Sequence, residues 1–370
     1  MLKAELATTL KDNSIINWND WRWQVSNSVI GDGPTHNATF MSTKISPYFY
    51  SLIDMSDALC PIRQQVCPSD KELSTDLMRY NREGINTFDS LSEEKLSPVK
   101  GLIHRYPDRV LLIMTNNCFT NCRFCTRKRL VSLSQTETID LEAAYNYIKT
   151  NSNIHDVILS GGDPLTLEDE KIDEVLSSLR EIPHVDIVRI GTRAPVVMPM
   201  RITNELVAML ARHHPIWINT HFNHKKELTN DAKNACEKII NAGIPLGNQT
   251  VLLKGINDTV DCIRDLCLGL VKMRVRPYYL YQCDIGAGND HFRTKVQVGI
   301  DIIGRLRQNI SGFAIPNYVI DAPNGGGKFV INPNFIVERA EEKIVLKNAK
   351  GQLFVYPETN NESDLNQEKE

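Results

Sequence analysis

Short apolar runs alternate with helical stretches from Val110 onwards, and this alternation constrains the fold more than any other feature of the chain. The predicted strands are Val110–Met114, Asp156–Ser160, Asp186–Ile190, Ile216–Thr220, Gly247–Leu253 and Pro277–Gln282. The predicted helices are Leu141–Thr150, Glu168–Arg180, Thr203–Arg212, Glu227–Ala242, Thr259–Lys272 and Thr294–Asn309. Such alternation is typical of parallel strands joined by crossover helices, with site residues at the carboxyl ends of the strands. The pattern alone predicts an α/β fold, either an incomplete (βα)6 barrel or a doubly wound sheet.

The 370 residues are enough for one barrel domain with additional segments at both ends. We expect a polar helical region over residues 1–100, the barrel over residues 101–335 and a short C-terminal extension over residues 336–370. Trp18, Trp21 and Trp23 predict an amphipathic helix that packs its indoles on the main domain. The tail after about Lys347 ends in a polar stretch that cannot bury apolar surface, so we expect disorder there.

Composition argues against several classes of partner. A net charge of −3 gives no reason to expect nucleic acid or a membrane surface as a partner. No apolar run is long enough to span a membrane and the N-terminus has no signal-peptide pattern, so we expect a cytoplasmic protein. The nine cysteines then fit metal ligands together with reduced thiols, and we interpret Cys60 and Cys67 as structural.

Three cysteines follow the first predicted strand with the spacing C-x3-C-x2-C. Cys118, Cys122 and Cys125 could hold three irons of a 4Fe–4S cluster and leave the fourth iron open to a small molecule. Zinc is the alternative, but a closed zinc site needs four ligands, and among nearby residues only His104 could supply the fourth.

This motif resembles that of the radical S-adenosylmethionine (radical SAM) superfamily. The flanking segments 104–109 (HRYPDR) and 125–129 (CTRKR) resemble those of the lysine 2,3-aminomutase family, which also uses pyridoxal phosphate (PLP). The similarity extends over roughly residues 15 to 335. It implies the open, TIM-like (βα)6 barrel, a 4Fe–4S cluster on the three cysteines, and both SAM and PLP as cofactors.

The resemblance assigns SAM contacts to the ends of three predicted strands. Ser160, Gly161, Gly162 and Asp163 end the second strand, where glycines permit close approach of a ligand to the backbone. Taken alone, this stretch is better explained as a tight turn between a strand and a helix. The family uses this segment to receive the amino group of SAM. It places further SAM contacts in the segments that hold His221 and Gln249.

The resemblance implies PLP contacts in two segments, one before the first predicted strand and one in the last predicted strand. Arg105, Tyr106 and Arg109 precede the first predicted strand, and two guanidinium groups with a phenol are well matched to a phosphate dianion. A solvated basic turn is the alternative. In the family this segment anchors the PLP phosphate, and we assign Tyr281 to the same cofactor site.

The glycine-rich run 321–328 first suggests a nucleotide-binding P-loop. Ala322 stands where the first glycine of that motif belongs, and Phe329 replaces the Ser or Thr that follows its lysine, so the pattern fails. The resemblance instead implies that Lys328 forms the Schiff base with PLP. Asn324 stands where the family pattern has glycine, and asparagine tolerates a positive φ.

Charged residues near the same pocket would select the substrate. Asp284 and Asp321 form a carboxylate pair, and a cation between them would remove the cost of burying both. Lysine-specific members of the family use matching aspartates for the substrate ε-ammonium. Arg127 matches the residue that binds the substrate carboxylate.

The resemblance therefore implies an isomerase, a PLP-dependent radical SAM aminomutase that converts L-lysine into β-lysine. The alternatives are an arginine 2,3-aminomutase, a lysine mutase that serves modification of a translation factor, and a non-catalytic iron–sulfur scaffold. Glutamate as substrate is disfavoured by the two aspartates. We expect an electron donor such as flavodoxin or ferredoxin and a homo-oligomer. The interface zinc of the best-known members is not expected, because Thr259 replaces one ligand and no cysteine follows Cys283.

Overall fold

The computed structural model describes residues 18–31, 41–131, 139–348 and 350–359. Its main sheet has the strand order β11-β10-β9-β8-β7-β6-β5-β4-β3, and the strands from β4 to β10 are parallel. The bounds are β3 Leu102–Tyr106, β4 Arg109–Thr115, β5 Asp156–Gly161, β6 Ile187–Gly191, β7 Ile216–Thr220, β8 Leu246–Leu252, β9 Arg276–Gln282, β10 Asn317–Ala322 and β11 Gly327–Val330. The six predicted strands are confirmed as β4 to β9.

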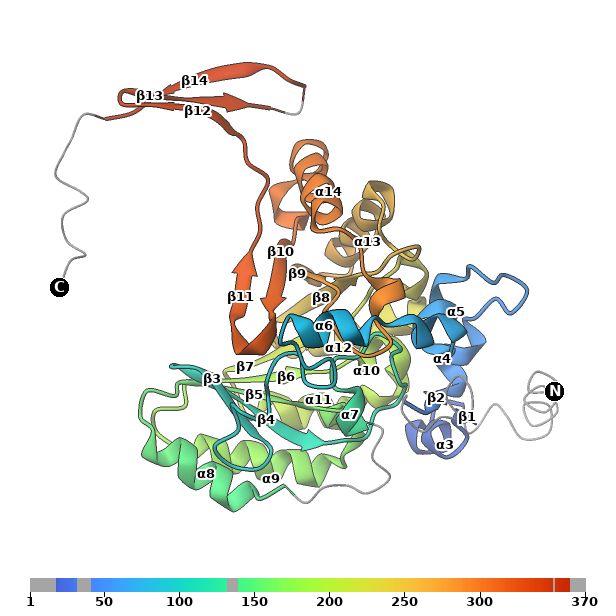
Figure 1. The fold of residues 1–370 in the computed structure, drawn as a ribbon. Helices are drawn as coiled ribbons and strands as arrows, with labels where there is room; N and C mark the ends of the chain where they lie inside the picture. The colour runs from blue at the N-terminus through green and yellow to red at the C-terminus, as the bar shows by residue number, and fades with distance from the viewer. Residues whose placement is uncertain (1–17, 32–40, 132–138, 349, 360–370) are drawn as a thin grey trace.

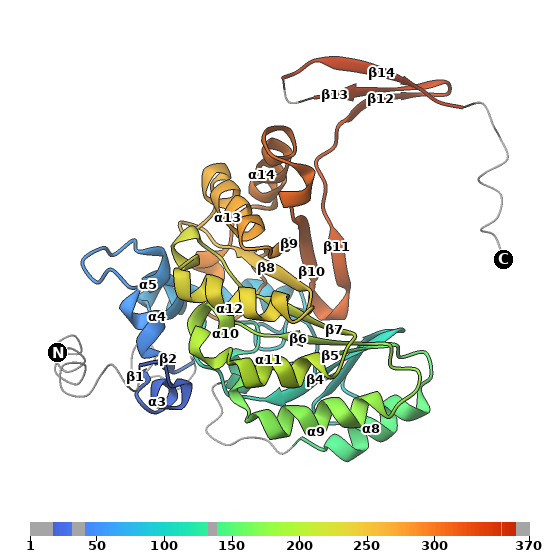
Figure 2. The same ribbon diagram turned by 180° about the vertical axis from the view of Figure 1, so that it is seen from behind.

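The predicted crossover helices are confirmed within three residues at each end. They are α8 Leu141–Thr150, α9 Asp169–Arg180, α11 Asn204–Ala211, α12 Asn230–Asn241, α13 Val260–Lys272 and α14 Val296–Asn309. Thr203, Thr229 and Thr259 begin three of them as N-caps, because each side chain accepts a backbone N–H of the first turn. Figures 1 and 2 show these helices along the outer face of a strongly curved sheet, so the barrel is confirmed over the doubly wound alternative.

The strands divide their residues between a helix-covered core and an internal cavity. In β5, Val157 and Leu159 are buried in the core, whereas Ile158 and Ser160 line the cavity. Burying an aliphatic side chain of this size contributes about 1.5–3 kcal/mol, so the outer layer fixes each strand while the inner residues remain available for binding.

The barrel is open, and its two edges meet through side chains. β3 pairs antiparallel with β4, and β11 pairs antiparallel with β10, so β3 and β11 are the edges of the sheet. The backbone N–H of Lys328 on β11 donates to the Tyr106 hydroxyl on β3 at 2.9 Å, and Arg105 pairs with Asp321 at 3.2 Å. We call this contact between the two edges the seam. Neither edge strand was predicted, and β10 was not predicted either. The sequence analysis placed Arg105 and Tyr106 before the first strand and treated residues 321–328 as a glycine-rich run, so the described part of the chain has seven parallel strands where six were expected.

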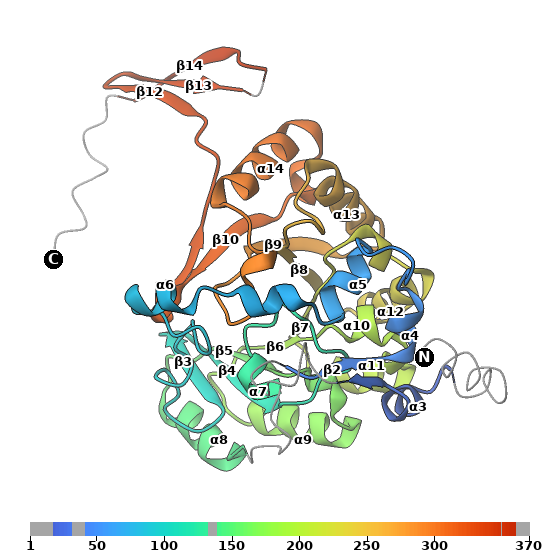
Figure 3. The ribbon, with the colours of Figure 1, turned by 45° about the vertical axis from the view of Figure 1, so that its right-hand side comes forward.

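The N-terminal region is less helical than predicted. It contains α3 Trp21–Ser26, β1 Val29–Gly31, β2 Thr43–Ile45, α4 Pro47–Ser51, α5 Pro61–Val66, a 3-10 helix at Asp70–Ser74 and α6 Leu77–Arg82. Trp21 packs edge-on against Phe119 at 6.3 Å, and Arg201 lies 4.7 Å from its ring, so the indole docks on the barrel as predicted. Figure 3 shows α5 and α6 crossing the open side of the barrel. Two further short helices are α7 Lys128–Val131 and α10 Ala194–Val197.

A three-stranded antiparallel sheet follows the barrel and projects from its body (Figure 1). Its strands are β12 Ile336–Ala340, β13 Lys343–Lys347 and β14 Leu353–Pro357. β14 lies beyond Lys347, where we expected no ordered structure, and it forms because it completes a ladder with β13. Residues 360–370, which we also expected to be disordered, lie outside the described residues. None of the helices in the described segments is long and apolar enough to cross a membrane.

Candidate active site

One cavity of about 700 Å³ lies inside the barrel, and every residue predicted to bind metal, cofactor or substrate lines it. These residues are Cys118, Cys122, Cys125, Arg127, Ser160, Gly161, Gly162, Asp163, His221, Gln249, Arg105, Tyr106, Arg109, Tyr281, Asp284, Asp321 and Lys328. The cysteine loop follows the carboxyl end of β4, whereas Arg109 begins the same strand. At about 3.3 Å per residue these ends lie about 20 Å apart, so the cavity spans the barrel.

The N-terminal region fixes the cysteine loop in place. Arg123, between the second and third cysteines, has no solvent exposure and pairs with Glu72, which is equally buried. Its Nε and Nη2 donate to Glu72 at 2.9 and 2.5 Å, and Nη1 donates to the Met41 carbonyl at 2.7 Å. The backbone N–H of Arg123 donates to the Gln65 carbonyl at 2.8 Å. Sequence spacing gave no hint of these anchors.

The three cysteines of the loop line the cavity, and their thiols are surrounded by protein. Burial, with Cys125 and then other acidic neighbours adding to it, raises the pKa of Cys118 well above its ordinary value. Burial raises the pKa of Cys125 to about 11, so bound metal would be needed to hold the thiolates. Across the described residues, no three Cys, His, Asp or Glu side chains are gathered to hold a metal ion, and this holds for the three cysteines of the loop as well. His104, the candidate fourth zinc ligand, instead bonds the Tyr147 hydroxyl at 2.9 Å.

The Gly-Gly-Asp segment packs directly against the cysteine loop. A Cβ on Gly161 would lie 2.3 Å from the Thr115 carbonyl oxygen, and one on Gly162 would lie 2.1 Å from that of Asn117. Only glycine fits such contacts, and Gly161 also has a φ of +124°. The Asp163 carboxylate accepts hydrogen bonds from Thr192 and from the backbone N–H groups of Leu165 and Arg193 at 2.7–3.0 Å. This carboxylate therefore orders the segment itself.

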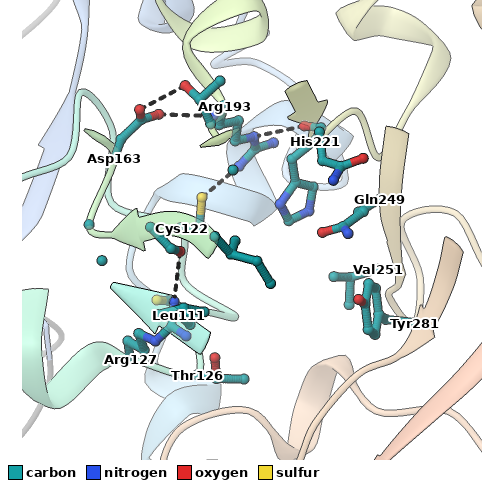
Figure 4. Close-up of a pocket in the computed structure, with 18 of the residues that line it drawn as sticks. Leu111, Cys122, Thr126, Arg127, Asp163, Arg193, His221, Gln249, Val251 and Tyr281 are labelled. Atoms are coloured by element: carbon teal, nitrogen blue, oxygen red, sulfur yellow. Dashed lines mark hydrogen bonds between the residues drawn. The ribbon is translucent and has the colours of Figure 1, made fainter. Parts of the chain in front are cut away.

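Arg193, which was not predicted, connects the SAM-related residues to the cysteine loop. In Figure 4 it lies between Asp163, Cys122 and His221. Its Nη1 donates to the Cys122 sulfur at 2.7 Å, and its Nε donates to the His221 carbonyl at 3.2 Å. Burial, with the charge of Arg193 adding to it, lowers the pKa of His221 to about 3, so this imidazole is neutral at physiological pH. Gln249 faces the same part of the cavity (Figure 4).

The seam gathers the residues predicted for PLP. Arg109 stacks 3.8 Å from the centre of the Tyr106 ring, and the Lys328 ammonium lies 5.6 Å from that of Tyr281. Arg105 donates to Asp321 at 3.2 Å and to the Leu91 carbonyl at 3.0 Å, while its Nε is buried without a partner among the described residues. A buried N–H group without a partner is costly, so this guanidinium is suited to receive a phosphate oxygen.

The register of the β10–β11 hairpin explains how Lys328 reaches this place. Lys328 and Asp321 are partners across the hairpin, and the ammonium lies 3.0 and 3.3 Å from the two carboxylate oxygens. Asn324 in the turn has a φ of +58°, which confirms that it adopts the conformation expected of the glycine it replaces.

The two aspartates of the cavity differ in their partners. Asp321 pairs with Arg105 and Lys328, whereas no ion pair links the Asp284 carboxylate to any described residue. Burial, followed by the charge of Asp321, raises the pKa of Asp284 to about 7. Asp284 is therefore only partly ionised at neutral pH, which agrees with the expectation that burial of two neighbouring carboxylates raises the pKa of one of them.

Arg127 already has a carboxylate partner, Glu93, which the sequence analysis missed. Its Nε lies 3.0 Å from both Glu93 oxygens, its Nη2 lies 2.6 Å from Oε1, and its Nη1 donates to the Ser160 hydroxyl at 3.1 Å. The acid comes from the N-terminal region, so that region contributes to the cavity wall as well as to the cysteine loop.

Comparison with known proteins agrees with this arrangement. Residues 112–266 match the model of the radical SAM superfamily, and residues 303–369 match the C-terminal model of lysine-2,3-aminomutase. The chain is 46% identical to the L-lysine 2,3-aminomutase of Acetoanaerobium sticklandii, over 92% of this chain and 85% of that protein. It is also 46% identical to the enzyme of that name from Clostridium subterminale, over 94% and 86%. The glutamate 2,3-aminomutase of Clostridioides difficile is 40% identical, over 91% and 82%. The chain therefore belongs to the lysine 2,3-aminomutase family of radical SAM enzymes.

Proposed function

We propose that this enzyme converts L-lysine into β-lysine by moving the α-amino group to the neighbouring carbon. The observation that carries the proposal is the distribution of charge in one cavity: a guanidinium, Arg127, beside the cysteine loop, and two carboxylates, Asp284 and Asp321, beside Lys328. An α-amino acid with a distal cation has the complementary charges. The names of the two relatives at 46% identity point to the same substrate.

The radical SAM domain implies a 4Fe–4S cluster and SAM, and we assign the cluster to Cys118, Cys122 and Cys125. We assign SAM to the wall formed by residues 160–163, His221 and Gln249, which adjoins the cysteine loop. When bound, the cluster and SAM supply a radical that can break an unactivated C–H bond, which side-chain acid–base chemistry cannot do. The protein must hold the substrate in reach of that radical and keep water away.

PLP belongs to the same proposal and fits the seam. Arg105, Tyr106 and Arg109 would hold its phosphate, and the partnerless Nε of Arg105 supports this assignment. Lys328 would bind its aldehyde carbon, and Tyr281 would flank the ring. When bound, PLP supplies a π system that stabilises the migrating amine. Asp321 keeps the Lys328 ammonium in place until the cofactor arrives.

The substrate would lie between the two charged ends of the cavity. Arg127 can offer a planar pair of N–H donors to the α-carboxylate, a geometry that lysine cannot reproduce. Asp284 and Asp321 would receive the ε-ammonium. Burial and then the charge of Asp321 raise the pKa of Asp284 to about 7, so binding of the ammonium would favour the ionised form of Asp284, and the new ion pair would offset the repulsion between the two carboxylates.

The same two carboxylates separate this substrate from the glutamate used by the Clostridioides difficile relative. A glutamate side chain would bring a third carboxylate to Asp284 and Asp321, where burial and then the charge of Asp321 already raise the pKa of Asp284. Arginine also carries a cation and remains the competing substrate. We also propose that the enzyme takes its electron from a protein such as flavodoxin or ferredoxin, acts in the cytoplasm and forms a homo-oligomer.

The test is anaerobic incubation of the reconstituted enzyme with SAM, a reductant, PLP and lysine, arginine, ornithine, alanine and glutamate in competition. Chromatography with mass spectrometry would separate α- from β-amino acids. We expect β-lysine as the main product. Preferred turnover of arginine would select the arginine enzyme, and efficient turnover of alanine or glutamate would show that the aspartates do not face the substrate side chain.

A further inference from the structure

The Glu93 carboxylate occupies one edge of the Arg127 guanidinium. The Nε–H and one hydrogen of Nη2 point to Glu93, and one hydrogen of Nη1 points to the Ser160 hydroxyl. A guanidinium has five N–H groups, so these partners leave one hydrogen on Nη1 and one on Nη2. A carboxylate that enters the cavity therefore meets Arg127 at its Nη1–Nη2 end and not at the edge that Glu93 covers.

Glu93 is itself rigidly held. The Asp89 carboxylate accepts the backbone N–H groups of Glu93 and Glu94, each at 3.0 Å, which fixes the turn that presents the acid. Arg129 lies 3.2 Å from Asp89 and 3.6 Å from Glu93. The side chain of Glu93 is 6% exposed and that of Arg127 is 17% exposed, so solvent screens their attraction only weakly.

The same turn also contacts the proposed PLP site. The Ser90 carbonyl accepts the backbone N–H of Asn324 at 2.8 Å, and the Leu91 carbonyl accepts Arg105 at 3.0 Å. Residues 89–94 thus touch both the hairpin that carries Lys328 and a residue proposed to bind phosphate. A segment that contacts all of these groups can set the distance between the substrate carboxylate and the cofactor.

The charges around Glu93 allow a second carboxylate to bind. Burial raises the pKa of Glu93, but the charge and hydrogen bonds of Arg127, and then the charge of Arg129, outweigh it and leave that pKa below its ordinary value. Glu93 is therefore ionised at neutral pH. When a substrate carboxylate reaches Arg127, the two anions share the positive charges of Arg127 and Arg129.

We propose that Glu93 is a positioning residue for the substrate, which confines its carboxylate to one end of Arg127 and thereby sets where the β-carbon lies. This inference rests on the proposed function, because it takes the ligand of Arg127 to be an α-amino acid. A misplacement of about 1 Å can cost about a hundredfold in rate. The role is distinct from fold stabilisation, because it acts only through Arg127.

A double-mutant cycle tests this role. We expect Glu93→Gln to lower kcat/KM for L-lysine by about tenfold or more. The glutamine amide has one acceptor oxygen, so it cannot bind the paired N–H groups of Arg127 through two oxygens as the carboxylate does. In an Arg127→Lys background, the side chain has no planar pair of N–H donors for Glu93 to hold. The same change should there alter kcat/KM by less than about twofold. Glu94→Gln is the matched control, because the Glu94 side chain is 72% exposed and its ion pair is with Arg129 and not with Arg127. Iron content and PLP absorbance should match the wild type in all these variants. Because Glu93→Gln removes one partner of a mostly buried ion pair, it should lower the melting temperature, so kcat/KM is measured well below that temperature.

The outcomes separate the inference from the proposed function. Equal losses from Glu93→Gln in both backgrounds, or no loss in the wild-type background, would overturn the positioning role while the function stands. A wild-type protein that neither binds nor converts L-lysine would overturn both. If Glu93→Gln does not fold, Glu93→Asp keeps the charge on a shorter side chain, and the same non-additivity with Arg127→Lys is expected of it.

Discussion

Replacing Glu72 by glutamine would remove the counterion of Arg123, whose guanidinium lies in the cysteine loop without any access to solvent. Breaking a buried ion pair by removal of one partner typically costs about 3–5 kcal/mol, mainly because the remaining charge is left uncompensated. The Met41 carbonyl still accepts one N–H of Arg123, but a carbonyl dipole does not replace a full charge. We therefore expect Glu72→Gln to lower the free energy of unfolding by about 3–5 kcal/mol.

Urea denaturation followed by tryptophan fluorescence would measure this change, because Trp21 packs on Phe119 in the cysteine loop. The matched control is Glu168→Gln, which removes the partner of Arg22 in an ion pair whose side chains are 63% and 51% exposed. An exposed pair contributes about 0–1 kcal/mol, so the control should stay close to the wild type. The variant should also retain less iron after reconstitution. A change below about 1 kcal/mol with full iron retention would refute the anchoring role of this pair.

Four further outcomes follow from the cavity. Cys122→Ala should abolish iron–sulfur absorbance and SAM cleavage, while Cys236→Ala, on the buried face of α12, should keep both. SAM cleavage by the first variant would contradict the cluster assignment. Borohydride should label Lys328 in the PLP-loaded protein, and label on another lysine would refute its role. The KM for L-lysine should fall as pH rises through about 7, because Asp284 must lose its proton to pair with the ammonium. A KM that does not change with pH in the wild type, or a fall in KM that is still seen in Asp284→Asn, would contradict this. Asp321→Asn should lower lysine turnover on the order of a hundredfold while SAM still binds, and turnover near the wild-type rate would refute its contact with the substrate.

Local patterns predicted the crossover units well because each depends on short-range information. The run Ile216–Thr220 is recognisable from its own apolar residues, and α13 is marked by its capping threonine and its apolar face, so the bounds of both can be read from a few neighbouring residues. The edge strands β3 and β11 were missed for the opposite reason. The segment of β3 looks charged in the sequence, and β11 follows directly on a glycine-rich turn, so neither has a clear strand pattern of its own. Each can be identified as a strand only from its pairing with a neighbouring strand.

The residues of the candidate site also fall into two groups, those that the sequence could predict and those that it could not. Residues carried by a motif, such as Cys118 or Lys328, could be named from sequence, because the chemistry needs them at a fixed spacing. Glu93 and Arg193 could not, because their function depends on which segment folds over which: Glu93 meets Arg127 only when the N-terminal region crosses the open side of the barrel. The spacing of residues along the chain does not predict such contacts.

The most direct test of the central claim follows one nitrogen atom. L-lysine labelled with 15N at the α-amino group and 13C at the β-carbon has no one-bond coupling between the two labels. Incubated anaerobically with the reconstituted enzyme, SAM, PLP and a reductant, it should give β-lysine in which the 13C signal is split by directly bonded 15N. Recovery of unchanged lysine, or of β-lysine that has lost the 15N, would contradict an intramolecular amino migration by this enzyme.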